Sequence, residues 1–339
     1  MYSNKWGRFM FGLYNLKPTS VCSAVRRAAG RSGFSRTAVC EQRTLWLQGA
    51  ARVETERRHS GSRSVSQTTV DPAEVRRFQS LATKWWDEQG EFAALHALND
   101  LRVPFVRDNL LNVHRARHPG KPLAELRILD VGCGGGLLTE PLGRLGANVL
   151  GIDPVEDSIG TAHLHSSHDP DLVDRVLFRA CTLEQLSGEG EGEQEEQGAA
   201  QFDAVVASEV VEHLADLETF ALCCSNVLKP GGSLFITTIN KTNLSYALAV
   251  VVAERLLRIV PNGTHDWEKF ISPVELERLL ESHGFSVQSV QGMLYNPMSG
   301  AWSWTNSTSI NYALHAVKLS DVTEDSDAHL EDHAAAAHS

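Results

Sequence analysis

Residues 129–136 read Leu-Asp-Val-Gly-Cys-Gly-Gly-Gly, and Asp153, 17 residues later, ends a second apolar stretch, 148–152. The apolar run 126–131 predicts a buried parallel strand. Glycines that follow such a strand let the backbone turn tightly and approach a ligand without Cβ clashes. An acid at the end of the next strand can bind ribose hydroxyls, as in doubly wound α/β folds. The stretch therefore predicts an adenosine-binding turn.

The position of Asp130 separates two classes of adenosine site. Asp130 stands two residues before Gly132 and, with Gly134 and Gly136, gives Asp-x-Gly-x-Gly-x-Gly. Dinucleotide sites have Gly-x-Gly-x-x-Gly instead. S-adenosylmethionine has no pyrophosphate, but its ammonium and sulfonium groups favour nearby carboxylate and carbonyl oxygens. We therefore predict a site for S-adenosylmethionine, with a dinucleotide site as the alternative.

Charge is distributed unevenly along the chain. Residues 1–70 hold 12 basic and three acidic residues, so residues 71–339 hold the other 19 basic and 39 acidic ones. The leader is rich in Arg and Ser and has no sustained apolar run, which is typical of a mitochondrial transit peptide. The alternative is a disordered basic arm that binds nucleic acid, and the acidic body disfavours it.

Cysteine spacing and hydropathy exclude two classes of protein. The six cysteines form no Cys-x-x-Cys pair, so we expect neither a disulfide framework nor a zinc cluster. No segment reaches the roughly 20 apolar residues that a membrane span needs. Any contact with a membrane is therefore expected to be peripheral. The cysteines are Cys22, Cys40, Cys133, Cys181, Cys223 and Cys224.

Alternating periodicities predict an α/β fold with a seven-stranded parallel, Rossmann-like sheet and helices on both faces. The expected strands are 126–131, 148–152, 176–180, 202–208, 233–239, 285–292 and 311–319. The expected helices are one from about 137, then 158–166, 216–228 and 273–283, and Lys229-Pro230-Gly231-Gly232 marks the stop before the fifth strand. Helical spacing over 72–111 predicts an N-terminal cover for the donor pocket.

These patterns divide the chain into a leader, a helical cap, a catalytic domain and a tail. The acidic, glycine-rich run 187–198 and the tail are expected to be solvated and flexible. The predicted boundaries are 1–70 for the leader, 71–122 for the helical cap, 123–319 for the α/β domain and 320–339 for the tail.

A second polar cluster, residues 208–213 (Ser-Glu-Val-Val-Glu-His), follows the fourth strand. That position lies at the carboxyl edge of the sheet, where open α/β folds bind ligands. If a helical turn begins near Glu209, then Glu212 and His213 share a face with it. Two carboxylates and an imidazole suit Mg²⁺ or a similar ion, with positions left for a bidentate catechol.

Two other interpretations of this cluster stay open. It can be an ordinary helix start, with acids favoured by the helix dipole and His213 packed against the sheet. His213 can also act as a general base without a metal. The metal and base roles are compatible, because a bound cation lowers the pKa of a phenol.

Residues 240–263 form an insertion between the fifth and sixth strands. A largely apolar stretch of 17 residues, 244–260, is flanked or interrupted by Lys241, Arg255 and Arg258. That length is short for a span but suits an interfacial helix pair that dips into lipid. A core helix or a dimer contact is the alternative.

Over about residues 71–319 the chain resembles the ubiquinone biosynthesis O-methyltransferase family. The resemblance rests on several motifs together: NDLRVP, LDVGCGGGLLTEPLGRLGA, GIDP, SEVVEHL, LKPGG and VPNGTHDWEKFI. It implies that Arg102 contacts the methionine carboxylate of the donor and that Gly132 and Asp153 hold its backbone and ribose sides. Ser208 is implied to line the donor pocket. The acidic loop and tail depart from the family pattern but touch none of these motifs.

The same resemblance implies the chemistry of the acceptor. It places the family's Mg²⁺ site on Glu209, Glu212 and His213, with Glu209 and His213 in catalytic roles, and a membrane-associating segment on 240–263. The implied substrates are polyprenylated catechol-type lipids, 3,4-dihydroxy-5-polyprenylbenzoate and demethylubiquinol. The implied location is the matrix side of the mitochondrial inner membrane, in a multi-subunit ubiquinone biosynthesis complex and without nucleic acid. Three rivals stay open: a soluble small-phenol O-methyltransferase, a non-catalytic assembly subunit, and a nicotinamide dehydrogenase.

Overall fold

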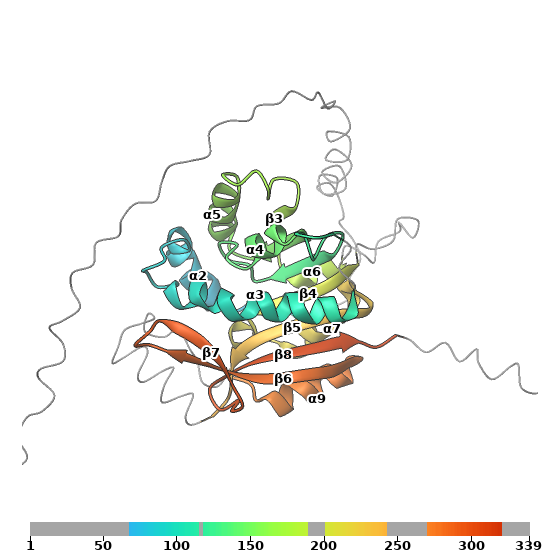
Figure 1. Ribbon diagram of the computed structural model, residues 1–339. Coiled ribbons are helices and arrows are strands. Elements are labelled where there is room, and N and C mark those ends of the chain that lie inside the picture. The colour runs from blue at the N-terminus through green and yellow to red at the C-terminus, as the bar shows by residue number, and fades with distance from the viewer. Residues whose placement is uncertain (1–67, 115–117, 189–200, 243–269, 321–339) are drawn as a thin grey trace, which may run out of the picture. The chain divides into compact units, whose positions relative to one another are not determined.

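The computed structural model describes residues 68–114, 118–188, 201–242 and 270–320, which centre on one eight-stranded sheet in the order β3-β2-β1-β4-β5-β8-β6-β7 (Figure 1). The strands are β1 Arg127–Val131, β2 Asn148–Asp153, β3 Val176–Ala180, β4 Phe202–Ser208, β5 Leu228–Ile239, β6 Phe285–Asn296, β7 Ala301–Thr305 and β8 Asn311–Lys318. Strands β1 to β5 pair in parallel, and β8 is antiparallel to both β5 and β6. The predicted α/β fold class is confirmed, but the sheet has one strand more than the seven predicted and is mixed rather than parallel, because the β5–β8, β8–β6 and β6–β7 pairs are antiparallel.

Helices cover both faces of the sheet because alternate residues of its central strands enter two different apolar cores. Leu129, Val205 and Leu234 belong to the core that includes α7 and α9, whereas Ile128 and Phe235 belong to the core of α3, α4 and α5. Burial on both faces explains why these strands read as continuous apolar runs. The helices are α2 Pro72–Leu81, η1 Ala82–Lys84, α3 Ala93–Val113, α4 Thr139–Arg144, α5 Glu156–Ser166, α6 Leu183–Gly188, η2 Val211–His213, α7 Leu217–Val227 and α9 Pro273–Ser282.

The N-terminal cover begins where local chemistry fixes a helix start. The Asp71 carboxylate accepts the Ala73 N–H at 2.8 Å, and Pro72 occupies the first turn, where its missing N–H costs nothing. Just before it, the Ala215 N–H donates to the Thr69 carbonyl at 2.9 Å. The cover is thereby tied to the segment that follows β4, and the predicted helical cover is confirmed.

Two boundaries differ from the sequence prediction. Lys229–Gly232 was expected to stop a helix before a strand, but β5 already begins at Leu228 and takes these residues in through a register shift against β4. At the other edge, β6 runs on to Asn296 and turns back into β7, a strand that the sequence prediction lacked.

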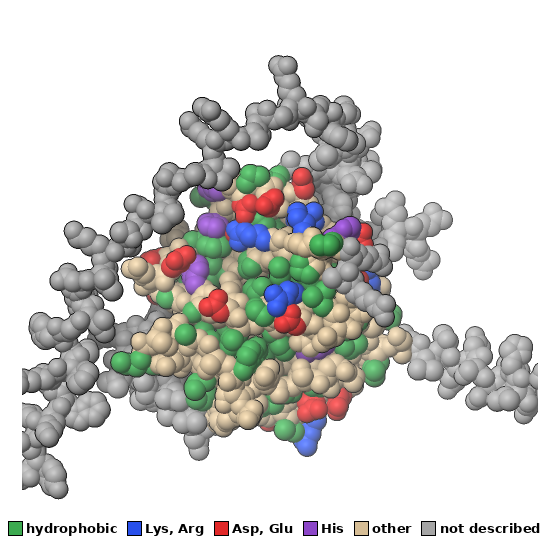
Figure 2. All heavy atoms as spheres, viewed as in Figure 1, with side chains coloured by type: hydrophobic (Ala, Val, Ile, Leu, Met, Phe, Trp, Pro, Cys, Tyr) green, Lys and Arg blue, Asp and Glu red, His purple; other side chains and the backbone are tan. Residues whose placement is uncertain are grey.

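Several predicted segments lie outside the described residues: the leader except its last three residues, nearly all of the acidic run 187–198, the insertion 240–263 beyond Thr242, and the tail after Ser320. Among the described helices, none is long and apolar enough to cross a membrane. On the face seen in Figure 2, acidic and basic side chains lie interspersed, with hydrophobic side chains between them.

Candidate functional site

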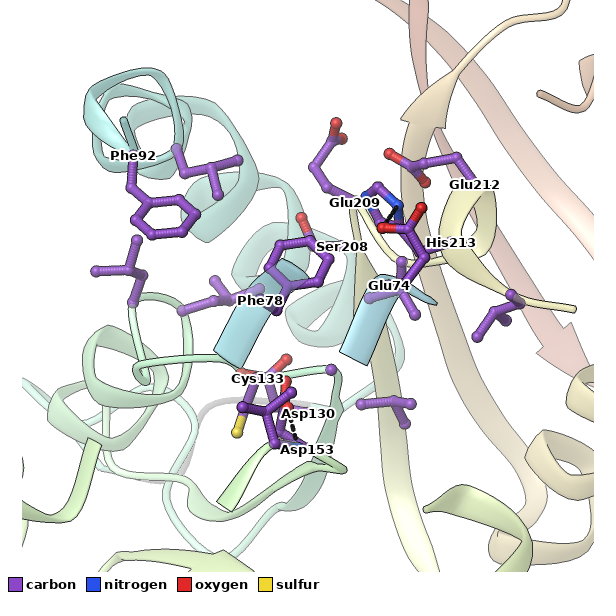
Figure 3. A pocket seen from close by; sticks show the side chains of 18 of the residues that line it. Glu74, Phe78, Phe92, Asp130, Cys133, Asp153, Ser208, Glu209, Glu212 and His213 are labelled. Carbon is purple, nitrogen blue, oxygen red and sulfur yellow. Dashed lines mark hydrogen bonds and ion pairs between the residues drawn. The ribbon is translucent and has the colours of Figure 1, made fainter. Parts of the chain in front are cut away.

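A cavity of about 370 Å³ lies at the carboxyl ends of β1, β2 and β4, beneath the N-terminal cover. Of the predicted site residues, all but Gly134 line it: Arg102, Asp130, Gly132, Asp153, Ser208, Glu209, Glu212 and His213. Figure 3 shows Asp130 and Asp153 at one end, Glu209, Glu212 and His213 at the other, and Phe78 of α2 between them. The two halves predicted from separate motifs therefore share one cavity.

The glycine turn after β1 has backbone conformations and contacts that a Cβ would disturb. Gly132 and Gly134 have φ values of 66° and 53°, in the left-handed region. A Cβ on Gly132 would lie 2.7 Å from Val210 Cγ2, and one on Gly134 would overlap the Trp85 ring. The tight turn is thus as predicted. Its glycines also leave room for the side chains of Val210 and Trp85 to pack against the backbone. Turn and cover form one packed wall of the cavity.

Two aspartates carry negative charge on the donor side. Asp153 accepts the Gly134 N–H at 3.0 Å and the Val155 N–H at 2.8 Å, while Asp130 accepts the Thr139 hydroxyl at 2.6 Å. Burial raises the pKa of Asp130 to about 6, against the opposing effect of the Thr139 hydroxyl. Burial likewise raises the pKa of Asp153 to about 6 despite its two backbone hydrogen bonds. Neither carboxylate is fully ionised in mildly acidic solution.

We expect the dissociation constant for S-adenosylmethionine to rise by about tenfold to a hundredfold between pH 7 and pH 5. A cationic donor stabilises ionised carboxylates, so it must displace any proton held by Asp130 or Asp153, whose pKa values are about 6. Titration calorimetry at several pH values measures the slope. Asp153→Asn is the comparison, with weaker binding and a shallower slope. A constant unchanged across this range would contradict the role of both acids.

Arg102 enters the cavity from the middle of α3. Arg102 is 4% exposed, and its guanidinium donates to Ser208 Oγ and to Asn99 Oδ1, both at 2.8 Å. Burial lowers the pKa of Arg102 to about 10, and the charges of Asp130 and Glu209 oppose that shift. A buried guanidinium is a preorganised partner for a carboxylate. Its contact with the donor's methionine carboxylate stays a prediction.

The acceptor side is built by the segment that follows β4. The expectation of a helical turn from Glu209 is wrong, because Glu209 has φ 57° and the 3₁₀ turn η2 begins only at Val211. A left-handed residue does not continue a right-handed helix. Glu209, Glu212 and His213 therefore do not share one helix face, although they line the same part of the cavity (Figure 3).

Glu212 is a buried carboxylate with an acidic neighbour. Its side chain is 2% exposed, and its Oε2 accepts the Thr238 hydroxyl at 2.8 Å. Burial raises the pKa of Glu212 well above its usual range, and the charge of Glu209 raises it further. Such a pair favours either a shared proton or a bound cation.

The cover contributes two contacts that motif analysis missed. Glu74 Oε2 lies 3.4 Å from His213 Nδ1, and the Phe78 ring meets the imidazole edge to face at 5.2 Å between centroids. Glu74 and Phe78 are four residues apart on α2 and so share a face. That spacing was visible in the sequence, but it does not say which loop the face meets.

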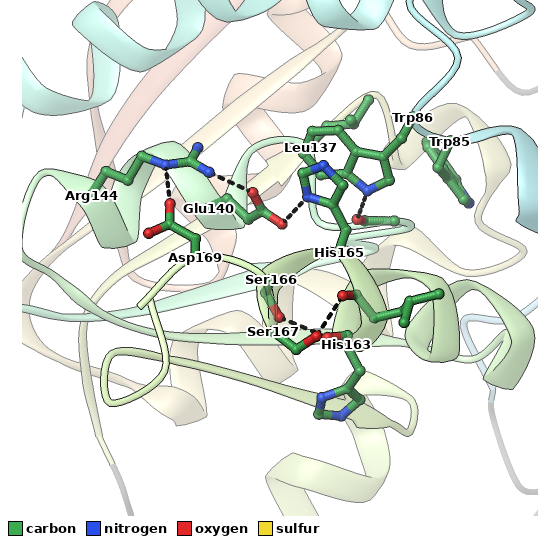
Figure 4. Close-up of polar contacts among 12 residues, drawn as sticks. Trp85, Trp86, Leu137, Glu140, Arg144, His163, His165, Ser166, Ser167 and Asp169 are labelled. Carbon is green, nitrogen blue, oxygen red and sulfur yellow. Dashed lines mark hydrogen bonds and ion pairs between the residues drawn. The ribbon is translucent and has the colours of Figure 1, made fainter. Parts of the chain in front are cut away.

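A cluster of polar side chains contacts the glycine turn through Trp86 (Figure 4). Glu140 is fully buried, with His165 Nδ1 at 2.7 Å and Arg144 Nη2 at 2.9 Å. The His165 ring stacks on Trp86, whose Nε1–H donates to the Gly135 carbonyl at 2.9 Å. The cover therefore holds the turn through a backbone carbonyl as well as through packing.

The described residues do not show the predicted Mg²⁺ site. Among the residues that the structure describes, no group of three His, Cys, Asp or Glu side chains is arranged to hold a metal ion. The chemistry of the donor set does fit a hard cation, because Glu209 and Glu212 supply carboxylate oxygens that repel each other. The metal role of these residues stays a proposal.

Comparison with known proteins agrees with this geometry. A family model described as a methyltransferase domain matches residues 104–290, more than half of the chain. The chain is 64% identical to the human ubiquinone biosynthesis O-methyltransferase, mitochondrial, over 75% of this chain and 67% of that one. The protein of the same name from Rattus norvegicus is 56% identical over 81% and 80%. The ubiquinone biosynthesis O-methyltransferase of Azorhizobium caulinodans is 44% identical over 74% and 95%.

The bacterial match covers nearly the whole of that relative, so the likeness is not confined to a single motif. The sequence predicted a methyltransferase, and the matching family model is a methyltransferase domain. The cavity lined by the glycine turn and by acidic side chains agrees with that prediction. The chain belongs to the ubiquinone biosynthesis O-methyltransferase family and is an S-adenosylmethionine-dependent O-methyltransferase.

Proposed function

We propose that this enzyme methylates ring hydroxyls of polyprenylated catechol-type lipids, 3,4-dihydroxy-5-polyprenylbenzoate and demethylubiquinol. The observation that carries the proposal is the single cavity shared by the donor turn and the acidic segment after β4. A catechol presents two adjacent oxygens, and the acidic segment offers both a base and cation ligands for them. The relatives' names supply the pathway.

The reaction is an in-line displacement at the donor's methyl carbon. A phenolate oxygen forms the new O–C bond, the S–C bond breaks with its electron pair left on sulfur, and S-adenosylhomocysteine departs. Since the sulfonium is already activated, the protein's task is to align the two reactants and to deprotonate the phenol. His213, whose Nδ1 lies 3.4 Å from Glu74 and whose ring contacts Phe78, is the proposed proton acceptor when its other ring nitrogen does not hold the metal ion. Arg102, Asp130 and Asp153 hold the donor.

Glu209, Glu212 and His213 are the proposed holders of Mg²⁺. Burial and, after it, the charge of Glu209 raise the pKa of Glu212, and a cation bound between the two carboxylates would offset both effects. When bound, the ion would stabilise the negative charge of the phenolate. The charge of Glu209 also acts on Arg102, so Glu209 couples the acidic segment to the proposed donor residues.

A methyl-transfer assay tests the assignment. With labelled S-adenosylmethionine and a short-tailed demethylated ubiquinol, we expect product in Mg²⁺ and a loss of about 100-fold or more in chelator and in Glu209→Ala. Glu88→Ala, an exposed acid of the cover, is the matched control and should keep full activity. Full activity of wild type in chelator would contradict the metal role. No product under any condition would contradict the substrate.

The location and partners of the enzyme belong to the same proposal. Residues 1–70 act as a mitochondrial transit peptide, 71–122 as the cap and 123–319 as the catalytic domain, and the enzyme lies on the matrix side of the inner membrane. The insertion 240–263 makes the peripheral membrane contact, and the enzyme is a component of a multi-subunit ubiquinone biosynthesis complex. The arginine-rich leader and the mitochondrial names of the mammalian relatives support this.

A further inference from the structure

The cavity continues beyond the acidic segment along the edge of the sheet. Strands β4, β5, β8, β6 and β7 are consecutive neighbours. Since β8 is antiparallel to β5 and β6, its first residue, Asn311, lies at the same edge as Ile239 of β5 and Met293 of β6. The cavity lining follows this edge to the β6–β7 hairpin, where it includes Leu294, Tyr295, Pro297 and Trp302.

The hairpin and the start of α3 together form an apolar wall. Tyr295 pairs with Trp302 across the two strands, with their rings 5.2 Å apart. The Trp302 Nε1–H donates to the Ala94 carbonyl at 2.9 Å, which fixes the hairpin against α3. From the α3 side, Phe92 and Leu95 line the same cavity. The indole nitrogen is thus satisfied by the backbone, and the ring is available for apolar contact.

This wall carries apolar side chains that water reaches. Leu294 is 41% exposed, and Met298, at the tip of the hairpin, is 92% exposed. Leu294 lines the cavity, and an exposed leucine at the mouth of a cavity is typical of a binding groove. Neighbouring strands lie about 4.8 Å apart, so β6 is about 14 Å from β4. An aromatic ring beside Glu209 does not reach that far, but a long ring substituent does.

We propose that the wall formed by Phe92, Leu95, Leu294, Pro297 and Trp302 is the subsite for the isoprenoid tail of the acceptor. The assignment rests on the proposed function, because it takes the substrate to be a prenylated ring. The ring lies beside Glu209, and its tail runs along the sheet edge and leaves the cavity past Leu294 and Met298. Apolar contact along the wall gives affinity for the tail without direction-specific hydrogen bonds.

Acceptors with and without a tail test the subsite. For Leu294→Asp we expect kcat/KM for a prenylated catechol to fall about tenfold, while kcat/KM for the same catechol without its prenyl chain stays within twofold of wild type. Leu222→Asp is the matched control, because Leu222 is 51% exposed on α7 and does not line the cavity. Equal losses on both acceptors, or no loss on either, would overturn the subsite.

A binding measurement separates this proposal from the reaction itself. Farnesol, an isoprenoid alcohol with no ring, should quench the fluorescence of wild-type protein and bind Leu294→Asp about tenfold more weakly. If farnesol binds both proteins equally or neither, the subsite is wrong even where methyl transfer proceeds. Failure of methyl transfer together with tail-dependent farnesol binding would contradict the proposed function and keep the subsite. A drop in thermal stability of Leu294→Asp without this discrimination would mean that the protein itself covers the wall.

Discussion

Replacement of Gly134 with alanine is expected to weaken S-adenosylmethionine binding by about 100-fold. Gly134 has φ 53°, where a Cβ costs about 1–2 kcal/mol. The new methyl group would also overlap the ring of Trp85, which is buried, stacked on Phe92 at 3.8 Å and bonded through Nε1 to Ser158 Oγ at 3.1 Å. Relief of the overlap must move either the turn or the cover, and overpacking of this kind costs about 1–3 kcal/mol.

The loss should appear in ligand affinity as well as in stability, because the Gly134 N–H is the group that donates to Asp153. Titration calorimetry gives the dissociation constant, and thermal unfolding gives the accompanying change in Tm. Gly160→Ala is the matched control: Gly160 is exposed in α5, and a Cβ there meets nothing within 4 Å. It should leave affinity unchanged and raise stability slightly. Equal behaviour of the two variants would contradict this account of the turn.

The donor half was predictable because it depends on local sequence. A strand, three alternating glycines and an acid at the end of the next strand fix a turn within about 30 residues, and Asp130, Gly132 and Asp153 all line the cavity. The second role of the glycines was not predictable. Contact between Gly134 and Trp85 joins residues 49 positions apart, and no periodicity carries that information.

For the acidic segment after β4, the sequence predicted which residues lie together but not their backbone geometry. Glu209, Glu212 and His213 do line one wall of the cavity. The prediction that they share one helix face is wrong, because no helix begins at Glu209. The left-handed conformation of Glu209 is held by its N–H, which donates to the carbonyl of Thr237 on the neighbouring strand at 2.8 Å. That bond depends on β4–β5 pairing, so single-sequence spacing could not supply it.

The β7 strand is a different kind of omission. Residues 301–305 read Ala-Trp-Ser-Trp-Thr, an alternation typical of a half-buried strand, so a local signal was present. Its five residues pair with the extension of β6 to form the hairpin that carries the proposed tail subsite. The missed strand therefore matters to substrate recognition more than to the core of the fold.

Glu212→Gln is expected to stabilise the protein and to inactivate it. Burial and the charge of Glu209 raise the pKa of Glu212 well above the 4.5 of a free glutamate. A carboxyl with a raised folded-state pKa contributes its full stability below its unfolded pKa and loses it as the pH rises through the folded value. The metal-free enzyme should therefore lose stability with rising pH, and an amide, which never ionises, should remove that part of the loss.

Glu212→Gln is expected to change stability and activity in opposite directions. Glutamine can still accept the Thr238 hydroxyl through its carbonyl oxygen. In chelator at pH 8, the free energy of unfolding should therefore rise by about 1 kcal/mol or more, while methyl transfer in Mg²⁺ falls by about 100-fold. Glu281→Gln, an exposed acid at the end of α9, should change neither quantity. Denaturant unfolding at several pH values and the methyl-transfer assay measure both.

Two outcomes would contradict this account of Glu212. If the variant is less stable than wild type in chelator, the Glu212 carboxyl stabilises the fold. If the variant keeps its activity, the reaction does not need Glu212. A gain in stability together with a loss of activity would mean that the charge of Glu212 destabilises the fold and is kept because the reaction needs it.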